Sequence, residues 1–374
     1  MAKIRVGVVF GGRSGEHEVS LMSAKSVMDA LRKGGYDVIP LGITKQGKWL
    51  TSGDPMKALL GTAGKEAQEE VVCAASHELD VMSRELVPGA GRTGIPQVDV
   101  VFPVLHGPYG EDGTLQGLLE MAGIPYVGSG VLGSALAMDK VAMKAVFRAE
   151  GLPIADYQMI LRHDWEERPA EAMGQIEKCF GYPCFVKPAN LGSSVGVTKV
   201  HGSAELAEAL NLAARYDRRL IVEEAINARE VECSVLGNER PIASVPGEVI
   251  PRREFYDYVA KYFDEDTRLI IPADLPRETV REIQKLAVRA FIALDCAGMA
   301  RADFFVSRDT GKPYVNELNT IPGFTATSMY PKMWEASGLS YPELVHRLVQ
   351  LALERYADRG RMSTSCKADD DAKV

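Results

Sequence analysis

The chain has 374 residues, of which 46% are hydrophobic and 25% are charged. This is enough apolar material for more than one packed core, which excludes a chain that is disordered throughout and a small disulfide-held scaffold. The 43 Lys and Arg residues against 51 Asp and Glu residues give a formal charge of −8 at pH 7, so a broad basic surface for nucleic acid is not expected.

Cysteine usage and hydropathy predict a cytoplasmic protein with no membrane contact. The six cysteines form no C-x-x-C pair, which fits a reducing compartment better than a zinc site or a disulfide framework. No apolar signal core follows a basic start. The longest uncharged run, residues 121–138, contains Pro125 and several glycines and therefore predicts strand and loop rather than a membrane span.

The chain opens with a β-α-β pattern. Residues 4–10 form an almost continuous apolar run that ends at a glycine pair, as expected of a strand buried on both faces of a parallel sheet. Apolar residues recur at helical spacing over residues 16–33, and residues 37–43 predict the next strand. These elements predict a parallel sheet with a right-handed crossover.

Strand and helix patterns continue to alternate, which favours an α/β fold class. Residues 52–95 predict a variable insertion with some helix, residues 248–270 a lid loop, and residues 363–374 a frayed end. Further strands are expected at 98–105, 125–127, 183–188, 195–200, 220–224, 230–236, 300–306 and 313–318. Further helices are expected at 114–122, at 139–150 with Asp139 as the N-cap, and at 203–215, 278–294 and 341–356.

A glycine-rich loop, GGRSGE at residues 11–16, separates the first strand from the first helix. It lacks the G-x-G-x-x-G pattern, so dinucleotide binding is poorly supported. Its glycines let a ligand approach backbone N–H groups at the start of the helix, and the carboxylate of Glu16 suits a ligand ammonium rather than a phosphate. The alternative is a first-turn glutamate that is favoured by the helix dipole.

A lysine followed by a Gly/Ser turn forms the second candidate site. Lys187 lies in an otherwise apolar strand, where a charge is costly, and Ser193 and Ser194 lie in the turn that follows. Hydroxyls and free amides of such a turn can wrap phosphate oxygens while the lysine supplies charge, although the Walker pattern is absent. The alternative is a plain hairpin turn.

An acidic cluster on two neighbouring strands forms the third candidate site. Residues two apart on a strand share a face, so Arg301 points the same way as Asp303, and Glu317 the same way as Asn319. If the two strands pair antiparallel, the oxygens of Asp303, Glu317 and Asn319 converge. That set suits Mg²⁺ bound together with phosphates. The alternative is a solvated sheet face.

Two further features remain open from the residues alone. Residues 255–262 (FYDYVAKY) place aromatic side chains around Lys261, and they either close over a ligand or form a packed surface loop. His106 ends a strand just before Gly107, where the clefts of parallel sheets lie. This histidine either contacts a ligand or is structural.

Seven motifs occur in order along residues 3–356: GGRSGEHEVSL, LHGPYGEDGTLQG, MDK at 138–140, VKPANLGSSVGV, YDYVAKY, GMARADFF and NELNTIPGFTATSM. As a set they resemble the D-alanine–D-alanine ligases of the ATP-grasp superfamily. The resemblance implies a Rossmann-like N-terminal domain at 1–128 followed by a two-subdomain ATP-grasp fold. Its central subdomain is expected at 129–224, its C-terminal subdomain at 225–360, and a flexible tail at 361–374.

The same resemblance implies a ligase that phosphorylates one D-alanine with ATP and joins the acyl phosphate to a second D-alanine, for peptidoglycan precursor synthesis. It also implies two Mg²⁺ (or Mn²⁺) ions and a homodimer. The implied catalytic residues are Glu16, Ser193, Tyr262 and Arg301. The implied substrate-binding residues are Glu16, His106, Gly323, Ser328 and Met329. The implied ATP-binding residues are Lys140, Lys187, Ser193, Ser194, Glu223, Glu224, Ile226, Glu230 and Lys261. The implied metal ligands are Asp303, Glu317 and Asn319.

Tyr262 bears on the second substrate. In the resembled family a tyrosine at this place accompanies D-alanine, whereas a phenylalanine accompanies D-lactate. The resemblance implies a hydrogen-bonded chain from Tyr262 through Ser193 to Glu16.

Three other functions are weighed against this one. A D-alanine–D-lactate ligase, or another carboxylate–amine ligase of the superfamily, would share the chemistry and differ in the substrate pocket. A nicotinamide oxidoreductase is disfavoured by the missing G-x-G-x-x-G pattern and by the acidic cluster. A nucleotide-binding regulator without catalysis is disfavoured because Lys187, Arg301 and the three candidate metal ligands are all present.

Overall fold

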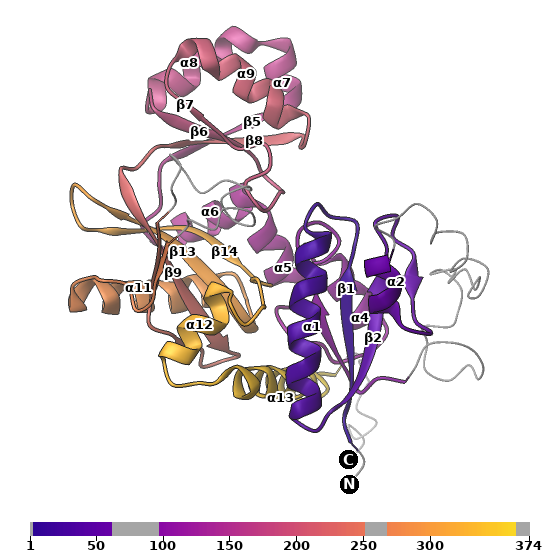
Figure 1. Cartoon of the computed structure of the whole chain (residues 1–374). Coiled ribbons are helices and arrows are strands. Elements are labelled where there is room, and N and C mark those ends of the chain that lie inside the picture. The colour runs from indigo at the N-terminus through magenta and orange to yellow at the C-terminus, as the bar shows by residue number, and fades with distance from the viewer. Residues whose placement is uncertain (1–2, 62–96, 251–267, 364–374) are drawn as a thin grey trace, which may run out of the picture.

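The computed structural model describes residues 3–61, 97–250 and 268–363. Three β-sheets follow one another along the chain, each with helices packed on it (Figure 1). Each sheet lies inside one of the three segments expected from the sequence, while the domain boundaries themselves stay a prediction. The mixed α/β fold class is confirmed.

The first sheet has the strand order β3-β2-β1-β4. Its long strands are parallel to one another, and the short β3 adds an antiparallel edge. Buried residues fill β1 and β4, as expected of central strands covered on both faces. The strands are β1 (Arg5–Gly11), β2 (Asp37–Ile43), β3 (Trp49–Leu50) and β4 (Val100–Val104), and the helices are α1 (His17–Lys33), α2 (Pro55–Gly61) and α4 (Thr114–Met121). The strand expected at 125–127 is present as one bridge, between Val101 and Tyr126.

The second sheet is antiparallel, with the order β5-β8-β6-β7. Figure 1 shows its three helices gathered above the sheet. Their apolar residues, such as Ile176 and Leu206, pack onto Val186 and Val222 of the central strands. The strands are β5 (Tyr157–Leu161), β6 (Cys184–Pro188), β7 (Thr198–Val200) and β8 (Arg219–Glu224), and the helices are α7 (Arg162–Glu167), α8 (Pro169–Cys179) and α9 (Ser203–Ala214).

The third sheet has the order β12-β11-β9-β13-β14, with β10 paired to β9. All of its pairs are antiparallel. Its strands are β9 (Ala228–Gly237), β10 (Ile242–Ala243), β11 (Gly247–Ile250), β12 (Arg268–Ile270), β13 (Gly298–Ser307) and β14 (Pro313–Asn319). Its core is shared with α6 (Lys140–Ala149) and α11 (Arg277–Ala293), which contribute Phe147 and Phe291. Asp139 caps α6, as expected, because its side chain accepts the backbone N–H groups of Val141 and Ala142.

The last two helices join the third sheet to the first. α12 (Met329–Ala336) and α13 (Tyr341–Arg359) contribute Tyr330 and Leu348 to a core that also contains Phe102 of β4 and Phe324. α13 packs directly against α1, and Figure 1 shows it running beneath both parts. The first and third sheets are therefore held by one continuous apolar core.

The expectation of strand and loop over residues 121–138 is wrong in its second half, where α5 (Val131–Met138) forms. A Cβ on Gly133 would lie 2.7 Å from the carbonyl oxygen of Asp295. The helix therefore needs glycine at this position, because it packs closely against the backbone of Asp295. Tertiary packing here outweighs weak local propensity. Within the described ranges, no helix is long and apolar enough to cross a membrane.

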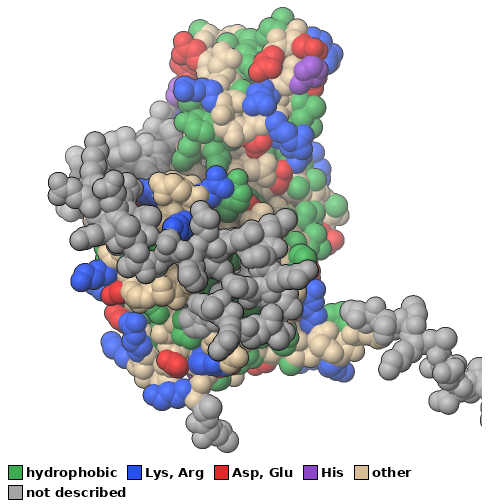
Figure 2. Space-filling model, turned by 90° about the vertical axis from the view of Figure 1, so that its right-hand side faces the viewer, with side chains coloured by type: hydrophobic (Ala, Val, Ile, Leu, Met, Phe, Trp, Pro, Cys, Tyr) green, Lys and Arg blue, Asp and Glu red, His purple; other side chains and the backbone are tan. Residues whose placement is uncertain are grey.

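Several predicted features fall partly outside the described residues. The structure describes only residues 52–61 of the predicted insertion at 52–95, and these include α2. It describes only the two flanks of the predicted lid at 248–270, where Ile250 pairs with Arg268. Lys261 and Tyr262 lie outside the described residues. On the face shown in Figure 2, basic and acidic side chains are interspersed over the described part of the surface.

Candidate active site

The loop after β1 carries Glu16 to the start of α1. Gly11 has φ 91°, and a Cβ there would lie 2.2 Å from the carbonyl oxygen of Ile43, so the tight turn requires glycine. The next residue, Gly12, donates its N–H to the same oxygen at 2.8 Å. Glu16 occupies the N-cap position but makes no side-chain cap hydrogen bond. Instead its Oε1 accepts the hydroxyl of Ser193, which favours a role beyond helix capping.

The turn after β6 lies opposite this loop. Ser193 and Ser194 have φ values of 51° and 58°, a left-handed conformation that is costly for serine and persists where surrounding contacts hold it. One such contact is the Ser193 hydroxyl bond to Glu16. Another comes from Lys140 at the start of α6, whose Nζ donates to the carbonyl of Leu191 at 2.7 Å.

Lys187 is buried on β6 and takes part in a charge triad. Its Nζ donates to Glu223 Oε2 at 2.9 Å, and Lys144 Nζ lies 3.6 Å from Glu223 Oε1. Burial opposes ionisation of Glu223, but the two ammonium groups outweigh it and hold the pKa of that carboxyl below its usual value. Burial also lowers the pKa of Lys144. The charge of Lys187 is therefore balanced inside the protein.

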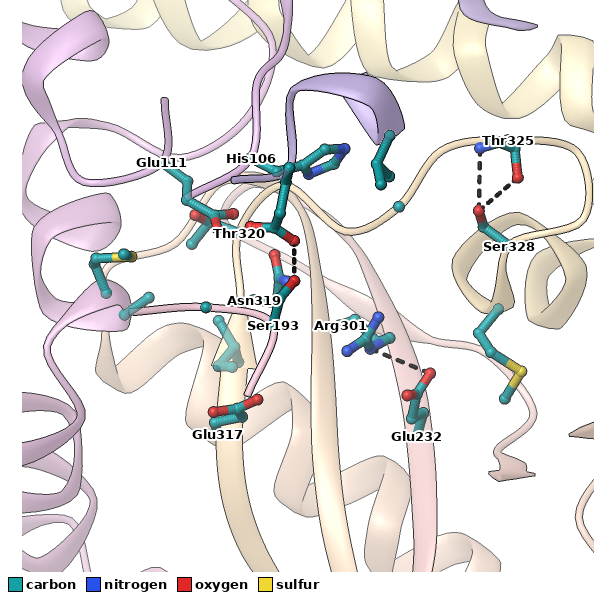
Figure 3. Close-up of a pocket in the computed structure, with 18 of the residues that line it drawn as sticks. His106, Glu111, Ser193, Glu232, Arg301, Glu317, Asn319, Thr320, Thr325 and Ser328 are labelled. Carbon is teal, nitrogen blue, oxygen red and sulfur yellow. Dashed lines mark hydrogen bonds and ion pairs between the residues drawn. The ribbon is translucent and has the colours of Figure 1, made fainter. Parts of the chain in front are cut away.

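The acidic cluster on β13 and β14 has the predicted antiparallel register. Asp303 lies opposite Glu317, and Arg301 opposite Asn319. Both carboxylate oxygens of Asp303 accept hydrogen bonds from Arg301, each at 2.7 Å. Arg301 also pairs with Glu232 of β9 at 3.2 Å (Figure 3). An arginine on a strand that pairs with two carboxylates is held in a fixed orientation.

The candidate metal ligands supply two carboxylates and one amide. Glu317 lies 3.6 Å from Lys140, and Asn319 Oδ1 accepts the backbone N–H of Ile321 at 3.0 Å. Among the described residues, no group of three or more His, Cys, Asp or Glu side chains is placed to hold a metal ion. Two carboxylates and an amide are hard oxygen donors that fit Mg²⁺ when phosphate oxygens complete its shell.

Two adjoining cavities receive these side chains. The larger, of about 320 Å³, lies between the Glu16 loop, the turn after β6 and the ends of β13 and β14 (Figure 3). The smaller, of about 120 Å³, lies between the second and third sheets. Both are lined by Lys140, Ser193, Glu232, Arg301 and Glu317. The arrangement can therefore present an ammonium-binding carboxylate and a phosphate-binding region to the same arginine.

Most of the predicted site residues line one or both cavities. In the larger cavity the structure places Glu16, His106, Lys140, Ser193, Arg301, Glu317, Asn319, Gly323, Ser328 and Met329. In the smaller cavity it places Lys140, Lys187, Ser193, Ser194, Glu230, Arg301, Asp303 and Glu317. Glu223, Glu224 and Ile226 line neither cavity. Glu224, at the end of β8, instead accepts the N–H of Asp156.

The far end of the larger cavity is closed by the residues near α12. Ser328 Oγ accepts the backbone N–H of Thr325 at 3.1 Å and lies 2.7 Å from its hydroxyl. A Cβ on Gly323 would lie 3.2 Å from the same Oγ. Met329 packs with Met333 and Val249 in a small apolar cluster. Hydroxyls beside an apolar wall suit a small substrate with a methyl group.

Sequence reasoning missed Glu111 and Glu232, which both line the larger cavity. Glu232 was detectable, because it lies two residues after Glu230 on the same strand and therefore shares its face. Glu111 lies inside a quoted motif, but only the fold shows that it is buried. Burial raises the pKa of Glu111 to about 8, with the charge of Glu16 adding to the effect.

Comparisons with known proteins agree along nearly the whole chain. A family model described as D-ala D-ala ligase N-terminus matches residues 5–129, and one described as D-ala D-ala ligase C-terminus matches residues 146–350. A D-alanine–D-alanine ligase of Thermoanaerobacter sp. (strain X514) is 53% identical over 96% of this chain and 99% of its own length. One of Acetivibrio thermocellus is 51% identical over 95% of this chain and 97% of its own.

Solved structures agree as well. The D-alanine–D-alanine ligase of Coxiella burnetii matches with a TM-score of 0.80 and 37% identity, covering 96% of this chain and 97% of that one. A D-Ala:D-Ser ligase from Enterococcus faecalis matches with a TM-score of 0.80 and 39% identity, covering 94% of this chain and 100% of that one. The chain therefore belongs to the D-alanine–D-alanine ligase family, whose ATP-grasp fold it shares.

Proposed function

We propose that this protein is an ATP-dependent ligase that joins two D-alanines into D-alanyl-D-alanine for peptidoglycan precursor synthesis. The observation that carries the proposal is the meeting of Glu16, Ser193 and Arg301 in one cavity, beside a second cavity lined by Lys187 and Asp303. An amino acid held by its ammonium at Glu16 would direct its carboxylate toward Arg301 and the bound phosphates.

In this proposal the reaction has two steps. The carboxylate of the first D-alanine attacks the γ-phosphate of ATP and forms an acyl phosphate. The free amine of the second D-alanine then attacks the acyl carbon, and phosphate leaves from the tetrahedral intermediate. Arg301 stabilises the negative oxygen of that intermediate, and it needs no reorganisation because Asp303 and Glu232 hold it in place.

Residues of the smaller cavity orient ATP. Lys140 and Lys187 neutralise phosphate charge, and the hydroxyls of Ser193 and Ser194 lie on the turn that covers them. Asp303, Glu317 and Asn319 would hold two Mg²⁺ (or Mn²⁺) ions, which when bound neutralise charge on the transferring phosphoryl group. Lys261 is assigned the transferred phosphate, and Glu223, Glu224, Ile226 and Glu230 the adenosine, by the family resemblance alone.

Gly323, Ser328 and Met329 form the proposed pocket for the second D-alanine. D-Lactate and D-serine are the alternative second substrates. D-Lactate follows from the family resemblance of the sequence, and D-serine from a 39% identical relative that is titled a D-Ala:D-Ser ligase. Tyr262 favours D-alanine over D-lactate. A homodimer and a cytoplasmic location are proposed from the family resemblance.

The test is phosphate release from Mg·ATP against a panel of D- and L-amino acids and D-lactate, with each product identified by mass. Stimulation by D-alanine alone, with the dipeptide as product, is the expected result. Stimulation by a different acid–amine pair would keep the acyl phosphate mechanism and overturn the pocket assignment. ADP formation that no amino acid stimulates would overturn the ligase and favour a nucleotide-binding regulator.

A further inference from the structure

A buried carboxyl in the larger cavity has no part in the mechanism above. Glu111 is 8% exposed, and its Oε1 accepts the backbone N–H of Gly107 at 2.8 Å. Its other oxygen, Oε2, is buried without a hydrogen-bond partner. A buried acceptor without a donor is costly unless a ligand supplies one.

Two further acceptors lie beside this carboxyl. A Cβ on Gly192 would lie 3.3 Å from Glu16 Oε2 and 3.9 Å from Glu111 Oε1, so both carboxyls border one small space. His106 lies 2.9 Å from the carbonyl of Ile321 through Nδ1. That oxygen can only accept, so Nδ1 donates the hydrogen bond. In the neutral ring Nε2 is then an acceptor, and it too is buried without a partner. Figure 3 shows His106 and Glu111 at the same end of the cavity, away from Glu232.

Burial and the neighbouring charges set the protonation states of Glu111 and His106 before substrate binds. Burial raises the pKa of Glu111 to about 8, the negative charge of Glu16 adds to the effect, and Lys140 and Arg301 oppose it. Burial lowers the pKa of His106, so this ring is neutral near pH 7. One carboxylate, one carboxylic acid and one neutral imidazole therefore face the cavity in the free enzyme at neutral pH.

We propose that Glu111 is a second ammonium-binding residue for the first amino-acid substrate, and that it releases its proton as the ammonium enters between it and Glu16. The O–H bond of the Glu111 carboxyl breaks, the proton passes to the buffer, and the ammonium keeps its three protons. Those three donors then match three acceptors, from Glu16, Glu111 and His106. This inference rests on the proposed function, because it takes the ammonium of the first D-alanine to bind at Glu16.

Proton release gives the direct test, with wild-type enzyme. D-Alanine is titrated calorimetrically into enzyme loaded with Mg·ADP, at pH 7 and at pH 9, in two buffers of different ionisation enthalpy. We expect release of close to one proton at pH 7 that is absent from Glu111→Gln, and little release at pH 9, where Glu111 is already ionised. No release at pH 7, or equal release by wild type and Glu111→Gln, would overturn the proposal. The wild-type count decides even if the variant does not fold.

Kinetics supply a second readout. Glu111→Gln is expected to raise KM for the first D-alanine by about 10-fold or more, since a charged partner is lost, while KM for ATP stays within about 2-fold. Wild-type KM for the first D-alanine should fall as pH rises from 6 to 8, and the variant should lose that dependence. Glu120→Gln is the matched control, because Glu120 lies on α4, outside this cavity, and bonds Tyr126.

The outcomes separate the inference from the function on which it rests. D-Alanine-dependent dipeptide synthesis with neither proton release nor a KM effect of Glu111→Gln would overturn the inference alone. Absence of any D-alanine-dependent phosphate release by wild type would overturn the proposed function and the inference together.

Discussion

The hydrogen bond from Ser193 to Glu16 joins two loops that are 177 residues apart in the chain. It connects the turn that is assigned to the phosphates with the residue that is assigned to the first D-alanine. Glu16→Gln keeps an acceptor for Ser193 but removes the charge. Ser193→Ala removes the hydroxyl donor and leaves a non-glycine residue at the same left-handed backbone position. The two variants and their double mutant form a thermodynamic cycle.

The magnitude follows from the kind of bond and its surroundings. A hydrogen bond to a charged group contributes about 1.5–3 kcal/mol, and this one is partly buried. Because Glu16→Gln keeps a neutral acceptor, whose hydrogen bond contributes about 0.5–1.5 kcal/mol, the cycle measures the difference of about 1–1.5 kcal/mol, which equals about 5- to 12-fold in kcat/KM for the first D-alanine. Glu16→Gln alone should weaken the first D-alanine by a similar factor. Mg·ATP affinity should stay nearly unchanged, because Glu16 does not line the smaller cavity.

The assay is steady-state kcat/KM for the first D-alanine in all four proteins, with nucleotide affinity measured by calorimetry. Effects of the two single variants that add to within about 0.5 kcal/mol would refute the coupling. Equal losses of D-alanine and nucleotide affinity in Glu16→Gln would point to a folding defect and refute the assignment of this carboxylate to the ammonium.

Three further predictions concern other residues. Tyr262→Phe should increase depsipeptide formation from D-alanine plus D-lactate, and a variant that still makes only D-alanyl-D-alanine would contradict the idea. Lys144→Met should leave the free energy of unfolding within about 1 kcal/mol of wild type or raise it, since Lys187 still pairs with buried Glu223 and burial already opposes the charge of Lys144; a loss of about 3 kcal/mol in a urea titration would contradict it. Glu111, with its pKa raised from 4.5 to about 8, binds more protons in the folded than in the unfolded state between these values. Wild-type stability should therefore fall as pH rises through that window. Glu111→Gln should be more stable than wild type at pH 8 but not at pH 5, and equal differences at both pH values would count against the assignment.

Local rules predicted those parts of the site that depend on strand geometry. The spacing predicted that Glu317 and Asn319 share a strand face, because side chains two residues apart do so whatever the rest of the fold is, and the predicted antiparallel pairing is present with Asp303 opposite Glu317. The glycine pair after the first strand predicted a loop before the first helix, and the structure adds that Gly11 adopts a positive φ that other residues resist.

Features that depend on tertiary burial could not be predicted from the local sequence. The charge of Lys187 is balanced by Glu223 from β8, which also pairs with Lys144 from α6, and nothing in the local sequence of β6 shows either residue. Glu111 carries a raised pKa only because the fold buries it near Glu16. α5 forms in a glycine-containing run because Gly133 lets it approach backbone near Asp295. Each of these effects comes from segments distant in the chain.

The central claim is that ATP activates the carboxylate of one D-alanine before the amine of a second attacks it. The most direct measurement uses D-alanine labelled with ¹⁸O in its carboxylate, with mass analysis of the phosphate and dipeptide formed from Mg·ATP. The account predicts that each phosphate carries one ¹⁸O atom from the first D-alanine and that the new peptide carbonyl retains the other. Phosphate without ¹⁸O, formed together with dipeptide, would contradict the acyl phosphate and the roles built on it.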